Sequence, residues 1–445
     1  MQATMTSDTE DLTAVGREAA ENGERSYWEA SAAPGPSRPQ LLNDLEVEVL
    51  IIGGGFTGLS TAYHLGQRGI ECAILEGRRV GFGASGRNGG GVSPRVRMPL
   101  SAIAARYGMD QARTVYRAGA DAVDTVAEMV HEMSISCSFV RNGAISVAHT
   151  APSLARLVKG ARWLSTNLGE RSSRELSAQE VKQLTGSPMF VGGLEIKNGG
   201  TIHPLQFVRG IAAHLDSSAV PIFENSPVIK LRRDGAKVEV TTEQARVRAR
   251  RVVIATNAYT NQTNFAPQLY ASIIPFQSAL IATERLKQAQ IRGILPAGRM
   301  LADARRVLRY ARVLDDRIIF GARGAFGDQA SPRTFSRLRK EMEQMFPATV
   351  GCRVEFQWSG KVDMTPEQLP QLGQLNDLVL YAMAYNGTGV AMSNFMGKQL
   401  AKVISGQHVD LGILRRDLRP IPFSALRTPA AHMAVGAMLL MDMFD

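Results

Sequence analysis

A glycine-rich turn between a predicted strand and a predicted helix is the feature that most restricts how this chain can fold. Residues 47–52 (VEVLII) are β-branched and almost continuously apolar, which is typical of a strand buried on both faces of a parallel sheet. Gly53, Gly55 and Gly58 follow at once in G-x-G-x-x-G spacing, and residues 59–66 continue as a predicted helix. The order strand, glycine turn, helix predicts the first half of a βαβ unit.

The segment after this helix completes the unit and indicates a ligand. Residues 71–75 (ECAIL) form a second predicted strand that ends at Glu76. In a dinucleotide-binding turn the first glycine permits the sharp bend, the second lets a pyrophosphate approach the backbone, and the third lets helix and strand pack closely. The unpaired N–H groups of the helix N-terminus favour phosphate, and Glu76 can accept hydrogen bonds from a ribose. The complete context predicts a Rossmann-type dinucleotide-binding unit.

A second glycine-rich segment, 81–91 (GFGASGRNGGG), follows directly. Its glycines let the backbone run close to a flat ligand, and Ser85, Arg87 and Asn88 can bond to phosphate or ring oxygens. The first motif does not distinguish NAD from FAD. A flavin that is buried along its whole length explains the second motif, whereas a nicotinamide cofactor has no evident need for it. We therefore expect FAD, with a flexible loop as the structural alternative.

Two later segments extend the pattern: VVIATNA at 252–258 and YNGTGVAMS at 385–393. With the two glycine motifs and Glu76, they resemble the FAD-dependent amine and amino-acid oxidases of the D-amino-acid oxidase superfamily. The resemblance runs from about residue 26 to the C-terminus. SYWEASAAP at 26–34 and LRTPA at 426–430 are most similar to the gamma-glutamylputrescine oxidase branch.

The resemblance implies which positions contact FAD. Glycines of the first motif and Glu76 would hold the ADP half, the second motif would line the pyrophosphate and the flavin ring, and a late helix N-terminus would favour the negative charge of reduced flavin. The expected cofactor-binding residues are Gly53, Gly55, Phe56, Thr57, Gly58, Glu76, Ser85, Arg87, Asn88, Gly89, Gly90, Val228, Thr256, Asn257, Asn386, Gly387, Thr388, Gly389 and Val390.

The chain departs from its sarcosine-type relatives at two positions. Those enzymes attach FAD through a cysteine, but the equivalent position here is about Gly360, and Cys352 lies too far upstream. We therefore expect noncovalent FAD. They also hold the substrate carboxylate with a lysine, and the equivalent position here is about Ala391. Either another cation replaces that lysine, with Arg309 as the candidate, or the substrate has no carboxylate beside the oxidised carbon.

The expected reaction is oxidation of an amine C–N bond to an imine, with hydride passing to flavin N5, hydrolysis to a carbonyl, and reduction of O2 to H2O2. No catalytic side chain is identified because the cofactor carries the chemistry. Arg309, Tyr310, Trp358 and Tyr385 are candidates for the substrate pocket; an exposed strand edge or an aromatic core explains them equally well. Three widely spaced cysteines and seven scattered histidines give no metal-site spacing, so no metal is expected.

Two alternatives stay open. One is a flavin amine or amino-acid dehydrogenase that passes electrons to a membrane carrier, because the apolar tail 430–444 could lie on a membrane surface. We favour packing of this tail on its own fold or on a second subunit. The other is a basic nucleic-acid-binding protein, since the net charge is +10. The basic residues form no stripe interleaved with aromatics, so we expect an amine or amino-acid substrate, O2 or another electron acceptor, and no nucleic acid.

The fold class expected is α/β: a Rossmann-type FAD-binding domain with a second, mainly antiparallel α+β substrate lobe. No oligomeric state is predicted. A cytoplasmic location is expected, because the cysteines are odd in number and no secretory signal is visible. The expected divisions are an N-terminal arm at 1–45, lying outside the main fold; the FAD-binding domain at 46–105, 198–262 and 355–412; the substrate domain at 106–197 and 263–354; and a C-terminal tail at 413–445.

Overall fold

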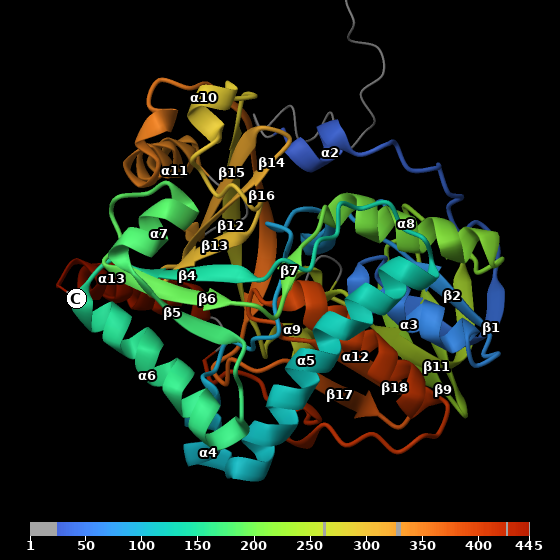
Figure 1. Cartoon of the computed structure of the whole chain (residues 1–445). Coiled ribbons are helices and arrows are strands. Elements are labelled where there is room, and N and C mark those ends of the chain that lie inside the picture. Colours follow the sequence, from blue (N-terminus) through green and yellow to red (C-terminus); the bar gives the residue numbers. More distant parts are fainter. Residues whose placement is uncertain (1–24, 261–263, 326–330, 424–425, 445) are drawn as a thin grey trace, which may run out of the picture.

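The computed structural model describes residues 25–260, 264–325, 331–423 and 426–444. Within them the chain forms two large sheets and a small one, with helices packed around them (Figure 1). The helices are α2 (Tyr27–Ser31), α3 (Phe56–Gly66), α4 (Leu100–Tyr107), α5 (Met109–Glu132), α6 (Ala151–Leu168), α7 (Ala178–Thr185), α8 (Pro204–Ser217), α9 (Pro267–Tyr270), α10 (Gln288–Ile291), α11 (Pro332–Met345), α12 (Gly389–Ile404) and α13 (Arg427–Phe444).

The first large sheet contains the predicted βαβ unit and has the order β17-β18-β11-β1-β2-β8, with β10 and β9 added beyond β11. Its central strands β18, β11, β1, β2 and β8 are parallel, and β17, β10 and β9 pair antiparallel. The strands are β1 (Leu45–Ile52), β2 (Cys72–Leu75), β8 (Ile222–Phe223), β9 (Lys230–Asp234), β10 (Lys237–Thr241), β11 (Arg246–Ile254), β17 (Gln371–Asn376) and β18 (Val379–Met383).

Strand β1 is buried on both faces, as its apolar run predicts. Val49 and Ile51 pack in a core cluster with helices α3, α5, α8 and α12, whereas Leu50 and Ile52 pack in a second cluster with β10 and β11. The alternation follows from the two-residue period of a strand. The sheet therefore has an apolar layer on each side, and its carboxyl ends carry the glycine turns.

The second large sheet has the order β16-β12-β15-β14-β13-β4-β6-β5. All its pairs are antiparallel except β13 with β4, so the expected antiparallel lobe is confirmed. Its strands are β4 (Ala144–Ala148), β5 (Ser173–Ser177), β6 (Gly192–Ile196), β12 (Ile274–Thr283), β13 (Met300–Asp303), β14 (Arg309–Leu314), β15 (Arg317–Ala325) and β16 (Val354–Met364), and the small third sheet pairs β3 (Gly91–Val92) with β7 (Gly200–Thr201).

Two parts of the chain lie elsewhere than expected. The described part of the N-terminal arm is not outside the fold: Tyr27 and Trp28 on α2 are buried, and the Trp28 ring packs against Trp358 with their ring centroids 6.0 Å apart. Burial of two aromatic rings stabilises the folded chain by more free energy than the ordering of the surrounding polar segment costs. Strand β16, expected in the FAD-binding domain, is the edge strand of the second sheet, because it pairs with β12 along its length.

Candidate active site

A cavity of about 750 Å³ joins the carboxyl ends of the first sheet to one face of the second sheet. Most residues predicted to contact a cofactor line it, although they come from segments far apart in the sequence. The predicted residues on its wall are Gly53, Gly55, Phe56, Thr57, Glu76, Ser85, Arg87, Asn88, Gly89, Val228, Thr256, Asn257, Tyr310, Tyr385, Gly387, Thr388, Gly389 and Val390.

The first glycine turn has the geometry that a pyrophosphate needs. Gly53 has a positive φ of 115°, and a Cβ there would lie 2.8 Å from the Ala255 carbonyl oxygen. Gly55 is the N-cap of α3 and brings no side chain to cap the helix. A Cβ on Gly55 would lie 2.9 Å from Ser85 Oγ, and any longer side chain would enter the cavity. The Phe56 N–H at this helix N-terminus donates to Ser85 Oγ at 2.9 Å, and the glycine turn leaves room for an anion beside the N–H groups that follow.

Glu76 stands at the end of β2 beside this turn. Its carboxylate accepts hydrogen bonds from the backbone N–H groups of Gly54 at 2.7 Å and Arg78 at 2.8 Å. Burial raises the pKa of Glu76, and the backbone N–H groups oppose that shift. A carboxylate has about four acceptor sites, so sites remain for the two hydroxyls of a ribose.

The second glycine segment is held in place from outside the cavity. Two indole N–H groups donate to consecutive carbonyl oxygens of the loop: Trp358 to Arg87 at 3.0 Å and Trp28 to Asn88 at 2.9 Å. On the cavity side, a Cβ at Gly89 would lie 2.5 Å from the Tyr310 ring. The loop is therefore fixed with its backbone facing the cavity, as close approach of a flat ring requires.

The third glycine turn, before α12, is fixed by a buried carboxylate. Asp363 on β16 accepts hydrogen bonds from Asn257 Nδ2 at 3.1 Å and from the backbone N–H of Ala384 at 2.6 Å. Burial raises the pKa of Asp363 to about 6. Tyr385 follows on the cavity wall and shares a hydrogen bond with Thr57 at 2.8 Å between the two hydroxyl oxygens. Asp363 thus joins strand β16 to two segments that line the cavity.

Comparisons with known proteins agree with this geometry. Residues 48–403 match the family described as FAD dependent oxidoreductases (DAO). The chain belongs to this family. The probable oxidoreductase OrdL of Haemophilus influenzae is 30% identical over 423 residues, which cover 94% of each chain. Gamma-glutamylputrescine oxidoreductase of Escherichia coli is 29% identical over 383 residues, covering 86% of this chain and 89% of that protein.

Solved structures show the same fold. Glycine oxidase from Geobacillus kaustophilus has a TM-score of 0.69 at 19% identity, covering 83% of this chain and 98% of its own. L-proline dehydrogenase from P. horikoshii has the same TM-score and identity, covering 83% of this chain and 96% of its own. Of the two classes of protein considered from the sequence, an FAD-dependent enzyme and a nucleic-acid-binding protein, the family match supports the FAD-dependent enzyme. The open helix N-terminus, the spare acceptor sites of Glu76 and the glycine-lined loop fit the ADP half and the ring of this cofactor.

Five of the predicted residues do not line the cavity. Gly58 and Gly90 lie against backbone carbonyl groups, of Gly53 and Ile202 respectively, and a side chain there would collide with them. Asn386 is fully buried, and its side-chain oxygen accepts the backbone N–H of Thr365 at 2.8 Å. These three residues pack against the backbone of the glycine turns and do not face the cavity.

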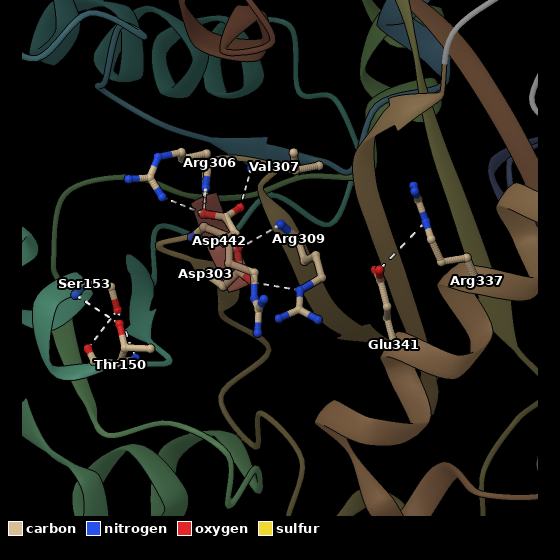
Figure 2. A network of polar contacts seen from close by, with 10 residues as sticks. Thr150, Ser153, Asp303, Arg306, Val307, Arg309, Arg337, Glu341 and Asp442 are labelled. Carbon is tan, nitrogen blue, oxygen red and sulfur yellow. Dashed lines mark hydrogen bonds and ion pairs between the residues drawn. The ribbon is translucent and has the colours of Figure 1, made fainter. Parts of the chain in front are cut away.

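The other two are substrate-pocket candidates that the structure places elsewhere. Trp358 is fully buried behind the loop that it holds. Arg309 is also buried, and its Nε donates to the Asp303 carboxylate at 2.8 Å (Figure 2). Because β13 and β14 are antiparallel neighbours, the acid and the arginine meet across the hairpin. Arg309, the candidate for a cation that replaces the lysine of sarcosine-type relatives, is therefore paired with an acid and does not line the cavity.

The end of α13 lies close to the same hairpin. The Asp442 carboxylate is buried and accepts hydrogen bonds from the backbone N–H groups of Arg306 at 3.1 Å and Val307 at 3.2 Å (Figure 2). Arg306 Nη1 also bonds to it at 3.1 Å. This end of the tail is therefore packed on its own chain. Within the described ranges, no helix is both long enough and apolar enough to cross a membrane.

Six charged residues on the cavity wall were missed from the sequence: Arg78, Arg95, Arg97, Arg156, Glu170 and Asp303. Arg95 and Arg97 lie shortly after the second glycine segment, two positions apart. That spacing on an extended segment was the available signal, because alternate residues of such a segment can face the same side. Glu170 gave no local signal, since it lies in the connection between α6 and β5.

Proposed function

We propose that this enzyme oxidises the C–N bond of an amine that carries no carboxylate on the oxidised carbon, with noncovalent FAD and with O2 as the electron acceptor. The observation that carries the proposal is the composition of the cavity wall. Among the lining residues that the structure describes there is no lysine, histidine or cysteine. Each of the three absences has a chemical consequence.

The missing cysteine and histidine support noncovalent FAD. Gly360, the position where sarcosine-type relatives carry the attaching cysteine, lines the cavity and offers no sulfur. Cys72, Cys137 and Cys352 are all buried and unpaired, and none lines the cavity. Unpaired cysteines also support the cytoplasmic location that we propose.

The cations that line the cavity are all arginines: Arg78, Arg87, Arg95, Arg97 and Arg156. The absence of a lysine at the position used by sarcosine-type relatives supports an amine substrate. Ala391 is fully buried in α12 and does not line the cavity, so the lysine of sarcosine-type relatives has no counterpart at this position. A carboxylate taken out of water needs a paired cation. Similarity to gamma-glutamylputrescine oxidoreductase over most of the chain supports a substrate whose oxidised carbon bears only the amine.

The three carboxylates on the wall, those of Glu76, Glu170 and Asp303, already accept hydrogen bonds from backbone or side-chain donors. Tyr385 is on the wall, but burial raises the pKa of its hydroxyl far above neutrality, which makes it a poor base. FAD, when bound, supplies the acceptor for the hydride. The protein's part is to orient the amine between Tyr310 and the α12 turn and to exclude water, and the substrate must arrive with its nitrogen unprotonated. The imine product is then hydrolysed to a carbonyl compound and ammonia or a smaller amine.

The proposal is tested with the purified yellow protein and matched substrates. Under anaerobic conditions an alkylamine should bleach the flavin, and its α-carboxylated analogue should do so far more slowly. Oxygen uptake with peroxide release identifies O2 as the acceptor, and bleaching without reoxidation by O2 identifies a dehydrogenase. Acid precipitation should leave the flavin in the supernatant. If glycine, sarcosine or D-alanine exceeds every amine in kcat/KM by a hundredfold, about 2.7 kcal/mol of transition-state preference, the amine assignment is wrong.

A further inference from the structure

Arg312 on β14 is a buried cation without an acid in contact with it. The residue is 2% exposed. None of the ion pairs among the described residues includes Arg312, and its Nε has no hydrogen-bond partner there. Burial lowers the pKa of Arg312 to about 10, and Tyr27 and Asp315 partly oppose that shift. Since this pKa stays well above neutrality, the guanidinium is charged at pH 7.

The hydrogen bonds of this guanidinium go to the backbone of the second glycine segment and of its neighbour β7. Arg312 Nη1 donates to the Ile202 carbonyl oxygen at 2.7 Å and to the Gly90 carbonyl oxygen at 3.5 Å. A Cβ on Gly90 would lie 2.6 Å from the same nitrogen. The charge is therefore in direct contact with the backbone at Gly90, and no side chain separates the two.

The same stretch of backbone borders the cavity. Gly89 and Gly91 line the cavity, whereas Gly90 between them does not. Tyr310, two residues before Arg312 on β14, also lines it. Alternate residues of a strand share a face, so Tyr310 and Arg312 lie along one face of β14, the first at the cavity and the second behind the glycine backbone. One layer of backbone therefore lies between the guanidinium and the cavity.

An unpaired buried arginine is an exception among the described residues. The other arginines that are less than a tenth exposed, Arg38, Arg309 and Arg317, each form an ion pair with a carboxylate. A charge taken out of water destabilises the folded chain unless an opposite charge is paired with it. The exception at Arg312 therefore points to a negative charge that the chain itself does not carry.

The reaction of a flavin enzyme produces such a charge. Transfer of a hydride brings two electrons and one proton to the flavin ring, so a neutral oxidised ring gains one negative charge. A buried cation stabilises the anionic reduced ring, and its effect on the neutral oxidised ring is much smaller. Water inside a protein would screen the cation, but Arg312 is sealed from the cavity and is therefore screened little.

We propose that Arg312 raises the reduction potential of bound FAD. It is a positioning residue that holds the backbone at Gly90 and keeps an unneutralised positive charge behind the flavin ring. Arg87, a second cation of the segment, differs because it is partly exposed and lies on the cavity wall, where it can contact the cofactor directly. This inference goes beyond the proposed function: it rests on the flavin ring lying along residues 81–91 and is independent of the substrate and of the electron acceptor.

The test measures two properties of the FAD holoenzyme that need no substrate. One is the reduction potential; the other is the Kd for sulfite, which adds to oxidised flavin and leaves a negative charge on the ring. Arg312→Gln keeps a donor and removes the charge, and Arg312→Met removes both while filling a similar volume, which protein interiors often tolerate. Each should weaken sulfite binding about tenfold and lower the potential by about 30 mV, the equivalent of tenfold for two electrons. Arg312→Lys keeps the charge and should restore most of both losses.

A merely structural role would change other quantities. If Arg312 only fixed the backbone at Gly90, Arg312→Gln and Arg312→Met would weaken oxidised and reduced FAD to the same extent, and the potential would stay unchanged. Titration of the apoprotein with FAD and denaturant unfolding of the apoprotein measure this role separately. Arg232→Gln is the control, because Arg232 is exposed on β9 and outside the cavity; it lowers the net charge equally and should leave the potential unchanged.

The outcomes separate this inference from the proposed function. If the holoenzyme oxidises no amine, the proposed function fails, and the potential still decides the role of Arg312. If amines are oxidised but Arg312→Gln and Arg312→Met keep the potential and sulfite affinity of the wild type, the inference is wrong and the function stands. A loss that Arg312→Lys does not restore would assign the effect to guanidinium geometry instead of charge, and would also overturn the inference.

Discussion

Replacing Glu76 tests whether the end of β2 binds the ribose of FAD. In the structure the carboxylate accepts backbone hydrogen bonds from Gly54 and Arg78. Glu76→Ala removes these bonds together with any bond to a ribose. This variant by itself therefore cannot separate a folding defect from a loss of ribose binding. Glu76→Gln removes the charge and keeps one acceptor oxygen, so it retains one of the two backbone bonds, which go to different carboxylate oxygens. It is therefore the milder and more informative change.

The expected magnitude follows from the number of bonds. A hydrogen bond to a charged group contributes about 1.5–3 kcal/mol, and a neutral one about 0.5–1.5 kcal/mol. Glu76→Gln should therefore weaken FAD by about 1–2 kcal/mol, roughly five- to thirtyfold in Kd. Glu76→Ala should weaken it further and should also lower the stability of the apoprotein, because the buried N–H of Gly54 loses its acceptor.

The assay is titration of apoprotein with FAD, followed by quenching of flavin fluorescence, with apoprotein unfolding measured in parallel. Glu71→Gln is the control, since Glu71 begins the same segment but is exposed and does not line the cavity. An unchanged Kd in Glu76→Gln would refute the ribose assignment. A loss of binding matched by an equal loss of apoprotein stability would show that Glu76 only supports the turn.

Three other predictions concern the cofactor turn, the substrate proton and the buried acid. Gly55→Leu should purify colourless, because its side chain would enter the cavity beside Ser85 Oγ, whereas Gly66→Leu, with no atom within 4 Å of its Cβ, should stay yellow; flavin absorbance checks both. The profile of kcat/KM should rise with pH to a plateau, since only the neutral amine releases hydride, and a flat profile would contradict this. Burial raises the pKa of Asp363 to about 6. Between about pH 4 and pH 6 the folded state therefore keeps a proton that the unfolded state has lost. The stabilisation from this protonated carboxyl is present below that window and is lost as pH rises through it. Denaturant unfolding should therefore show Asp363→Asn gaining about 2 kcal/mol relative to wild type between pH 4 and pH 7, and parallel pH curves would show that the carboxyl is not perturbed.

The cofactor half of the site was predictable because its determinants are local. The bend at Gly53, the open N-cap at Gly55 and the acid at Glu76 all lie within one βαβ unit, and each has a requirement that can be stated for a single position. The structure adds what no single position reveals, such as the fixing of the loop by Trp28 and Trp358. An aromatic pair within the polar N-terminal segment was the available signal, and overall composition obscured it.

The part of the cavity beside the second sheet was less predictable, because its charge depends on which arginines pair with acids in the folded chain. Arg309 and Arg95 are equally plausible cations in the sequence. The hairpin of β13 and β14 places Asp303 beside Arg309 and neutralises it, whereas Arg95 meets only a serine hydroxyl. Recognising this requires the register of strands and the position of a loop that joins α6 to β5, and neither follows from residue type or spacing.

The contacts of the second glycine segment, residues 81–91, also couple it to the second sheet. The carbonyl of Arg87 accepts its hydrogen bond from Trp358 on β16, and Gly89 lies against Tyr310 on β14. Both strands belong to the second sheet, whose strands β4 and β13 also line the cavity. A rigid sheet transmits a displacement of one strand to its neighbours, because interiors are close-packed. A change that shifts β4 or β13 would therefore also move the wall against which the loop rests.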